Sequence, residues 1–330
     1  MIVRNLGNTD IRVPGIAFGA WAIGGWMWGG TDDAEAIKAI HASIDEGINF
    51  IDTAPTYGMG HSERIVGQAI KDRRDRVILA TKCGVRWDLD SEAEGMPTVT
   101  PEGKAVKLIR CLRPESIRYE IEQSLTRLGV DCIDLYQCHW PDLKTPVAET
   151  MQTLVDLQKE GKIREIGVSN FTCEMMDECR KIGRLATDQP KYNPLERDIE
   201  TEILPYCIRH GIGVLPYSPI AQGLMTGKVG MDRTFREGDH RAGKPWFKPE
   251  NRKRILTMLD HIKPIAERHN ATLAQVTINW VISQPGISSA LVGARDADQV
   301  KENAGALAFQ LTNEEITTIR VLVEGLGAPA

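Results

Sequence analysis

The stretch from residue 133 to residue 168, IDLYQCHWPDLKTPVAETMQTLVDLQKEGKIREIGV, contains the unit from which the chain is built. Its two ends, Ile133–Cys138 and Ile163–Val168, are short, largely apolar runs that are typical of buried strands. Between them, Val147–Glu160 has the apolar spacing of an amphipathic helix. A strand, a helix and a second strand in this order indicate two parallel strands joined by a right-handed crossover.

The same alternation runs through the rest of the chain. Further strands are predicted at Ile16–Phe18, Asn49–Asp52, Val77–Thr81, Ala186–Asp188, Gly213–Pro216 and Ala290–Val292. Further helices are predicted at Ala34–Glu46, Glu63–Lys71, Pro114–Leu128, Glu174–Lys181, Glu200–His210, Asn251–His269, Ala297–Gly305 and Asn313–Glu324. Eight strands in 330 residues favour an α/β fold of the (β/α)8 TIM-barrel type, formed by residues 1–330 as a single domain. The competing fold is a doubly wound sheet, but the G-x-G-x-x-G motif that usually accompanies nucleotide binding there is absent.

Segments outside this alternation are also informative. Val3–Asn5 and Ile11–Val13 flank a Gly-Asn turn signal, which predicts a hairpin at the bottom of the barrel. The connections from Cys83 to Arg113 and from Ser218 to Glu250 are too long to serve as scaffolding alone. Loops of that length are usually functional or disordered.

Composition excludes several classes of function. A net charge of −5 and a pI near 5.9 argue against a nucleic-acid partner. The start of the chain lacks the apolar run of a signal peptide, and no apolar stretch reaches membrane-spanning length. Seven scattered cysteines, without metal-ligand spacing, fit free thiols in a reducing compartment. We expect a cytoplasmic protein with no bound metal, and the sequence leaves a homo-oligomer open.

Polar side chains gather where the predicted strands end. Asp52, Lys82 and His139 end the second, third and fourth strands, and Tyr57 follows Asp52 by five residues. In a (β/α)8 barrel the carboxyl ends of all strands meet at one face, where the chemistry takes place. Singly, the aspartate suits a helix cap, the tyrosine a turn and the histidine a structural role at the barrel mouth. The lysine is harder to explain, because buried lysines are seldom unpaired. Together the four predict a proton-transfer site.

The chemistry of these side chains supports that interpretation. A free phenol has a pKa of about 10, and a neighbouring ammonium lowers it. We therefore expect Lys82 to bring the pKa of Tyr57 towards neutrality, while Asp52 holds the buried ammonium in place. A neutral His139 would donate a hydrogen bond to a substrate oxygen and orient the carbonyl. The set contains neither an activated serine or cysteine nor a metal cluster.

Several stretches, in order, resemble the signatures of aldo-keto reductases. They are GINFIDTAPTYG (47–58), Thr81-Lys82, DLYQCHWPD (134–142), GKIREIGVSNF (161–171), Gln189, Tyr192-Asn193-Pro194, Tyr217-Ser218-Pro219 and Gly293–Asn303. The resemblance covers essentially the whole chain. It implies reduction of aldehydes and ketones to alcohols with NADP(H), with Asp52, Tyr57, Lys82 and His139 as the catalytic residues.

The resemblance also implies an extended NADPH site across the barrel mouth. It places Gly19, Ala20, Trp21 and Asp52 beside the nicotinamide, Ser169, Asn170 and Gln189 at its carboxamide, Tyr217 on its ring, Ser218, Pro219, Ile220, Gln222, Gly223, Leu224 and Lys228 around the pyrophosphate, and Gly293, Ala294, Arg295, Gln299, Glu302 and Asn303 at the adenosine end.

Arg295 is the residue on which the choice of NADPH over NADH depends. It directly precedes a predicted helix, where backbone amides favour phosphate, and its guanidinium matches phosphate geometry. The alternative is a surface pair with Asp296 or Asp298. Many reductases carry lysine at the position of Gly293 and arginine at that of Gln299, so this chain is similar to a bacterial branch with a Gly-x-Arg motif.

Aromatic residues predict the character of the substrate. Trp21, Trp26, Trp28, Trp87 and Trp140 fall in or beside predicted mouth loops, and we expect two or more of them to pack beneath loops or at a subunit contact. The predicted substrate pocket comprises Trp21, Trp28, Tyr57, Trp87, His139 and Trp140. Such a pocket suits an apolar or aromatic carbonyl compound. The basic residues between Cys83 and Arg113 either select an anionic substrate or form a solvated face.

Two other functions remain open from the sequence. A lysine at the end of a barrel strand is also compatible with a Schiff-base aldolase acting through Lys82. The chain further resembles potassium-channel β subunits, which bind NADPH while serving as partner proteins. No channel-docking feature is evident in the sequence.

Overall fold

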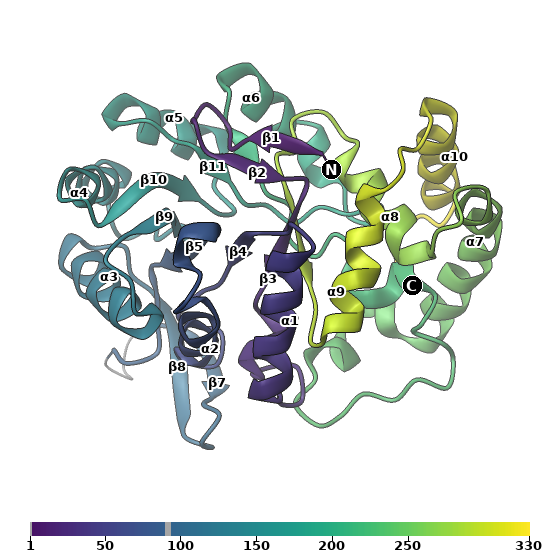
Figure 1. Cartoon of the computed structure of the whole chain (residues 1–330), viewed down its shortest axis with the longest axis horizontal. Helices are drawn as coiled ribbons and strands as arrows, with labels where there is room; N and C mark the ends of the chain where they lie inside the picture. Colours follow the sequence, from purple (N-terminus) through teal and green to yellow (C-terminus); the bar gives the residue numbers. More distant parts are fainter. Residues whose placement is uncertain (1, 90–93) are drawn as a thin grey trace.

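Eight short parallel strands follow one another around the centre of the molecule (Figure 1). The computed structural model describes residues 2–89 and 94–330. The strands are β3 (Ile16–Gly19), β4 (Phe50–Asp52), β5 (Ile78–Cys83), β9 (Ile133–Cys138), β10 (Ile163–Val168), β11 (Thr187–Asp188), β12 (Gly213–Val214) and β13 (Ala290–Gly293). Each corresponds to a strand predicted from the sequence, and the predicted (β/α)8 barrel is confirmed.

Pairing between neighbouring strands sets the level of the side chains inside the barrel. The sheet runs in the order β12-β11-β10-β9-β5-β4-β3-β13, and isolated parallel bridges join Val214 to Ile287 and Tyr217 to Leu291 where the ring closes. In β5 and β9, Lys82 lies opposite Gln137, so both side chains point to the same side. The register therefore places polar groups from different strands at one level of the barrel mouth.

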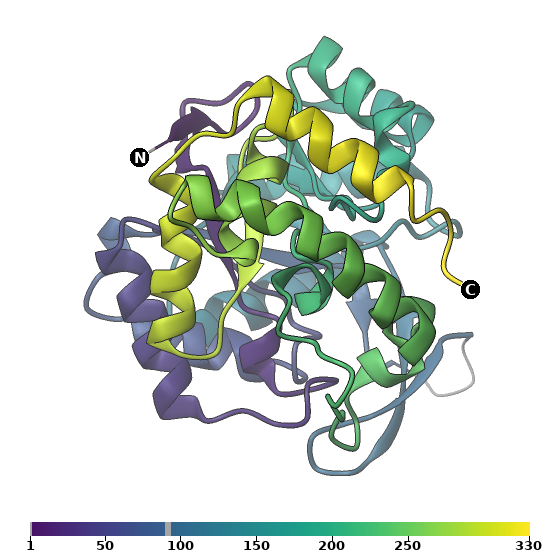
Figure 2. The same cartoon turned by 90° about the vertical axis from the view of Figure 1, so that its right-hand side faces the viewer.

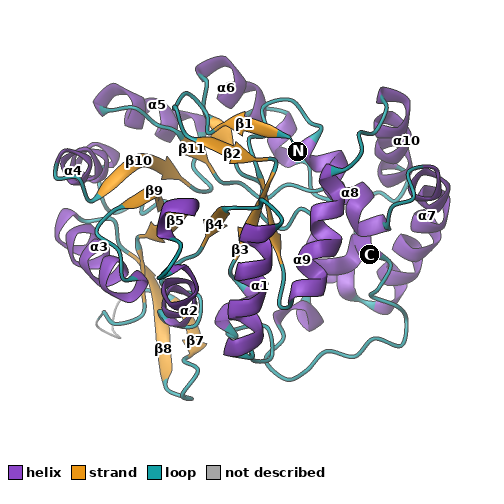
Figure 3. Cartoon of the chain, viewed as in Figure 1, coloured by secondary structure: helices purple, strands orange, loops and turns teal. Residues whose placement is uncertain are grey.

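Helices surround the strands (Figure 3). They are α1 (Asp33–Asp45), α2 (His61–Ile70), α3 (Pro114–Leu128), α4 (Val147–Lys159), α5 (Cys173–Ile182), α6 (Ile203–His210), α7 (Pro249–Arg268), α8 (Leu273–Ile282), α9 (Ala297–Ala304) and α10 (Asn313–Glu324). The long helix α7 packs against α10 on one side of the molecule (Figure 2). Apolar faces of these helices and the outward side chains of the strands form the main core.

Helix α8 is the one α-helix of the described chain that the sequence did not predict. Eight of its ten residues are buried, so it has no polar stripe to reveal a helical period. Its start is nevertheless encoded locally. The Thr272 hydroxyl accepts from the Gln275 backbone and the Gln275 side chain accepts from the Thr272 backbone, forming a capping box.

The predicted hairpin at the bottom of the barrel is present. Strands β1 (Val3–Asn5) and β2 (Arg12–Pro14) pair antiparallel. Leu6 and Val13 are completely buried and belong to one apolar cluster with Phe50 and Leu135, inside the barrel. The hairpin therefore closes the amino-terminal end of the barrel.

Both long connections contain regular structure. The first forms a three-stranded antiparallel sheet, and the second contains short 3-10 helices. The strands of the first are β6 (Val85–Arg86), β7 (Met96–Val99) and β8 (Ala105–Arg110), in the order β6-β8-β7. The 3-10 helices of the chain are η1 (Ala22–Gly24), η2 (Arg74–Arg76), η3 (Asp198–Glu200), η4 (Ala221–Thr226), η5 (His240–Gly243), η6 (Pro245–Phe247) and η7 (Gly305–Leu307).

Candidate active site

The ammonium of Lys82 lies at the centre of the polar groups in the barrel mouth. The side chain is completely buried at the end of β5. Its Nζ donates to Asp52 Oδ2 at 2.6 Å, to the Thr53 carbonyl at 2.9 Å and to Tyr57 Oη at 3.3 Å. These three contacts use all three ammonium protons. The predicted proximity of Lys82, Asp52 and Tyr57 is thus observed.

Asp52 connects this ammonium to two buried amides. Its Oδ1 accepts from Gln137 Nε2 at 3.0 Å and from Gln189 Nε2 at 2.9 Å. Gln189 Nε2 also lies 3.2 Å from Gln137 Oε1. Gln137 was not among the predicted site residues. Its signal was present in the alternation of β9, where a polar residue occupies the inward position two residues before His139.

The pKa of Tyr57 differs from the prediction. Burial raises it above the usual value and Asp52 adds to the rise, while the Lys82 ammonium lowers it only in part. The expectation that Lys82 lowers the pKa of Tyr57 below its usual value was therefore wrong, because the loss of hydration outweighs the neighbouring charge. The phenol consequently carries its proton at neutral pH. Lys82 Nζ nevertheless donates a hydrogen bond to the phenol oxygen.

The charge of Lys82 follows from its partners. Burial alone would lower its pKa, but Asp52 and Tyr57 together raise it above the usual value. The side chain is thus an ammonium at neutral pH, paired with the carboxylate of Asp52.

His139 is neutral in this environment. Burial, and then the positive charge of Lys82, hold its pKa well below the usual value. Its ring meets the Tyr57 ring edge to face, with centroids 5.8 Å apart. A neutral imidazole carries one N–H donor, as the sequence interpretation required.

A cavity of about 710 Å³ opens at this end of the barrel, and Asp52, Tyr57 and His139 line it. Most of the predicted cofactor residues line it as well: Gly19, Ala20, Trp21, Ser169, Asn170, Gln189, Tyr217, Ser218, Pro219, Ile220, Gln222, Gly223, Lys228, Gly293, Ala294, Arg295 and Gln299. Three predicted residues do not reach its surface. Leu224 is buried, Glu302 pairs with Lys228, and Asn303 donates to the Gly293 carbonyl at 3.3 Å.

A polar strip links the ends of β10, β11 and β12 along one wall of the cavity. Ser169 Oγ donates to the Gln189 carbonyl at 2.6 Å, and Asn170 Nδ2 donates to Ser169 Oγ at 2.9 Å. Tyr217 Oη donates to Asn170 Oδ1 at 3.2 Å. Asn170 has a positive φ of 60°, which turns the chain sharply at the end of β10. The strip fixes the groups that were predicted to meet a carboxamide.

Cations line the same cavity. Besides Lys228 and Arg295, the lining there includes residues that the sequence interpretation missed: Lys191, Arg233, Arg241 and Lys244. Burial, with further contributions from Lys191 and Arg241, lowers the pKa of Lys244 to about 8. The density of basic residues between Ser218 and Glu250 was the available signal.

Arg295 reaches across the mouth rather than pairing with its neighbours in sequence. Its guanidinium donates to the Trp28 carbonyl at 2.8 Å and lies 5.5 Å from the centre of the Trp28 ring. Asp296 instead accepts from the Gln299 backbone at 2.8 Å and caps α9. In the described part of the chain Arg295 forms no ion pair with Asp296 or Asp298, so the surface-pair alternative is not what the structure shows.

The predicted aromatic pocket is present, except that Trp26 lines it in place of Trp87. Trp21 and Trp28 pack with His240, all three ring pairs having centroids 4.9–5.2 Å apart. Trp26 and Trp140 also line the cavity. Trp87 does not reach the cavity surface; it packs against the apolar cluster of Met59, Val85 and Leu108 behind the wall.

The chain matches known proteins over nearly its whole length. A model of the aldo/keto reductase family matches residues 15–324. The chain belongs to the aldo-keto reductase family. It is 40% identical to the aldo-keto reductase YhdN of Bacillus subtilis, over 98% of this chain and 94% of that protein. It is 41% identical to the NADH-specific methylglyoxal reductase of Escherichia coli, over 97% and 98%. A glycerol dehydrogenase structure from Gluconobacter oxydans superposes with a TM-score of 0.88 at 41% identity, covering 98% of this chain and 96% of that one.

As an aldo-keto reductase, the protein is an oxidoreductase of a family that uses nicotinamide cofactors. The donor set of the cavity fits such a cofactor. Its lining combines several cations, the polar strip and the side chains of Asp52 and Tyr57, which Lys82 holds together. No helix in the described residues has the length and apolar character needed to cross a membrane.

Proposed function

We propose that this aldo-keto reductase reduces aldehydes and ketones to alcohols with NADPH, and that Tyr57 donates the proton. One observation carries the proposal: a fully buried ammonium, Lys82 Nζ, lies 2.6 Å from Asp52 Oδ2 and 3.3 Å from Tyr57 Oη beside the cavity. Bound NADPH supplies the hydride that attacks the carbonyl carbon. The protein must then provide a proton for the carbonyl oxygen.

Tyr57 supplies that proton from a phenol that is protonated at neutral pH. When the carbonyl is reduced, its oxygen takes the proton from Tyr57 Oη, which becomes a phenolate. Lys82 stabilises the phenolate, because its Nζ already donates to the same oxygen. His139, neutral and in ring contact with Tyr57, donates to the carbonyl oxygen and orients it.

The choice of NADPH rests on the cations that line the cavity and on the backbone of residues 218–223. Ser218, Ala221 and Gln222 have positive φ values of 57°, 48° and 54°, and Gly223 has 98°. Three non-glycine residues in that conformation within five positions are costly and are typical of functional backbone. Such a segment presents amides to a pyrophosphate, and Arg295 lies close enough to the mouth to bind a 2′-phosphate.

Lys82 does not support the aldolase alternative. An imine-forming lysine needs a neutral amine with a free lone pair. Lys82 has a raised pKa and donates to three acceptors.

The Tyr57→Phe variant tests the proton donor. Removal of the hydroxyl leaves the pairing of Lys82 with Asp52 intact, so we expect turnover to fall by about 10²- to 10⁴-fold with unchanged cofactor affinity. Turnover is measured with an aldehyde panel and affinity by quenching of tryptophan fluorescence. Tyr119→Phe, an exposed position on α3, is the matched control. Undiminished turnover in Tyr57→Phe would refute this role.

The Arg295→Gln variant tests the cofactor. If the guanidinium binds a 2′-phosphate, its loss weakens NADPH binding by roughly 10- to 100-fold and leaves NADH binding nearly unchanged. Both cofactors are titrated against wild type and against the exposed control Arg76→Gln. Equal losses for the two cofactors would contradict the preference for NADPH.

A further inference from the structure

The carboxyl group of Glu63 is completely buried on α2, although it does not line the cavity. Its Oε1 accepts from Thr81 Oγ1 at 2.7 Å, and its Oε2 accepts from Arg127 Nε at 2.6 Å. Thr81 is completely buried on β5, and Arg127 lies in the last turn of α3. Burial of a carboxylate is tolerated where partners satisfy it in this way. No step of the proposed reduction uses this group directly.

The bond to Thr81 joins α2 to the residue next to Lys82. Successive residues of a strand point to opposite faces, so Thr81 faces the helices while Lys82 faces the barrel interior. Thr81 pairs in register with Tyr136 of β9, one position before the pair of Lys82 with Gln137. A displacement of Thr81 therefore moves the backbone that carries the Lys82 ammonium.

The start of α2 also fixes the turn that carries Tyr57. The Ser62 backbone N–H donates to the Tyr57 carbonyl at 3.0 Å. Gly60 lies in this turn with a φ of 86°, and a Cβ there would lie only 2.7 Å from Arg127 Cδ. Arg127 therefore contacts both the carboxylate of Glu63 and the turn that leads from Tyr57 into α2.

Helices α2 and α3 lie side by side next to this part of the barrel (Figure 1). Gly67 of α2 permits the close approach, since a Cβ there would lie 2.7 Å from the carbonyl oxygens of Arg127 and Leu128. The ion pair of Glu63 with Arg127 spans this contact, and the Arg127 side chain is 15% exposed. One carboxylate thus joins α2, α3 and β5.

We propose that Glu63 is a positioning residue that fixes the distance between Lys82 Nζ and Tyr57 Oη. It acts on the ammonium through Thr81 and on the phenol through Arg127. The inference rests on the proposed function, in which Tyr57 is the proton donor. The two atoms lie 3.3 Å apart, so a displacement of about 1 Å would break their hydrogen bond. Misplacement by about 1 Å, caused by a residue far from the chemistry, can cost about 10²-fold in rate.

Thr81→Val tests this link while leaving the shape of the side chain nearly unchanged. The variant lacks the hydroxyl that donates to Glu63, so we expect the rate of NADPH oxidation by an aldehyde in a single turnover to fall by about tenfold. Neither Thr81 nor Glu63 lines the cavity, so the Kd for NADPH should equal that of wild type. Thr81→Ser keeps the hydroxyl but loses a buried methyl group, so it should be less stable and yet react at the wild-type rate.

Glu63→Asp provides a second measurement. Its shorter side chain cannot reach Thr81 and Arg127 together, so its single-turnover rate should also fall by about tenfold. Thr150→Val is the matched control, because it removes another buried threonine hydroxyl, which donates to the Leu112 carbonyl at 3.0 Å. Neither of these two residues lines the cavity, so its rate should be that of wild type.

Several results would overturn the positioning role of Glu63. They are an unchanged rate in Thr81→Val or Glu63→Asp, a loss in Thr81→Ser as large as that in Thr81→Val, an equal loss in Thr150→Val, and weaker NADPH binding that accounts for the slower reaction. Absence of any carbonyl reduction by wild type, or undiminished turnover in Tyr57→Phe, would instead contradict the proposed function.

Discussion

Asp52 and Asp188 are both buried carboxyl groups at the ends of barrel strands, and their surroundings are opposite. Asp52 faces the barrel interior, where Lys82, Gln137 and Gln189 donate to its two oxygens. Asp188 is completely buried at the end of β11, and no side chain among the described residues donates a hydrogen bond to either of its oxygens. Burial, opposed only by backbone amides, raises its pKa to about 8.

The orientation of each side chain explains the difference. Asp188 pairs in register with Val168 and Val214, which belong to the apolar layer between barrel and helices. Its neighbour Gln189 points the other way and reaches Asp52. A strand end therefore provides a functional carboxylate only on its inward side, where partners from other strands converge. On the outward side the same group is best accommodated with its proton on.

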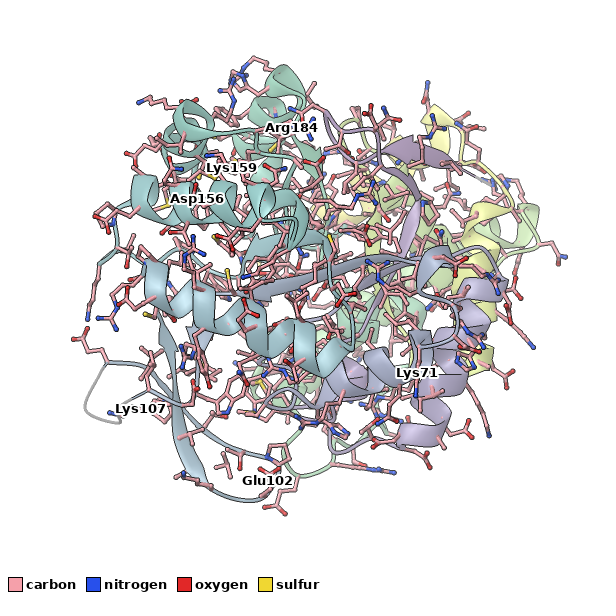
Figure 4. The ribbon with its side chains drawn as sticks, turned by 60° about the vertical axis from the view of Figure 1, so that its left-hand side comes forward. Lys71, Glu102, Lys107, Asp156, Lys159 and Arg184 are labelled. Atoms are coloured by element: carbon pink, nitrogen blue, oxygen red, sulfur yellow. The ribbon has the colours of Figure 1, made fainter. Side chains whose placement is uncertain are left out.

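Removal of the Lys82 ammonium should have the largest effect on activity and on the free energy of unfolding. Lys82→Met leaves Asp52 with a buried charge and no counterion, so we expect loss of activity and a decrease of about 3–5 kcal/mol in the free energy of unfolding at pH 7. Urea denaturation measures the decrease. The double variant Lys82→Met/Asp52→Asn should recover much of the stability but no activity. Lys71→Met, at an exposed position (Figure 4), is the control. Equal losses in the single and double variants would show that Asp52 is not the source of the effect.

The pH dependence of the free energy of unfolding should reveal the raised pKa of Asp188. Its pKa is about 8 in the folded state and about 4 in the unfolded chain, so its contribution is fully present below pH 4. As the pH rises from about 4 to 8, the unfolded state releases the proton first, and stability falls by about 1.4 kcal/mol per pH unit from this group.

Asp188→Asn removes that titration. We expect its free energy of unfolding, measured in urea at several pH values, to fall less steeply with pH than that of wild type between these limits. Asp188→Asn should become the more stable of the two near pH 8. Parallel curves for the two proteins would mean that Asp188 is already ionised in the folded state.

Loss of one amide donor should have the smallest effect. Gln137→Leu removes the hydrogen bond to Asp52 Oδ1 and the one that Gln137 Oε1 accepts from Gln189, but leaves the bond from Gln189 to Asp52. We therefore expect a decrease of about 2 kcal/mol in the free energy of unfolding. Gln152→Leu on α4, where the amide bonds to Asp156 at the surface, should change stability by less than about 0.5 kcal/mol. Thermal unfolding of both variants gives the comparison. Similar losses of stability in the two variants would mean that the buried amide of Gln137 contributes no more than the surface amide of Gln152.

The barrel and its central charges were predictable from the sequence because each depends on a local pattern. Strands and amphipathic helices alternate visibly, and a polar residue at the end of an apolar strand identifies Asp52, Lys82 and His139. Helix α8 escaped because burial on all sides leaves no helical period. The β7–β8 hairpin escaped because its alternation covers only a few residues between charged and glycine-containing segments.

Properties that depend on packing between distant segments were not predictable. The pKa of Tyr57 depends on how completely the loops of the mouth exclude water, which no local pattern encodes. The placement of Trp87 behind Val85 and Leu108, and the contact of Arg295 with the Trp28 carbonyl, likewise depend on the relative positions of loops far apart in sequence.

The amino-terminal hairpin closes one end of the barrel with apolar side chains. Leu6 and Val13 close the end opposite the cavity, and Phe50 and Leu135 belong to the same dry layer. Within the described chain, the titratable groups bonded to the Lys82 ammonium are Asp52 and Tyr57, and the layer beneath them is apolar. In the proposed mechanism, the hydrogen that Tyr57 gives away is replaced from solvent through the opening of the cavity, the same opening by which the alcohol departs.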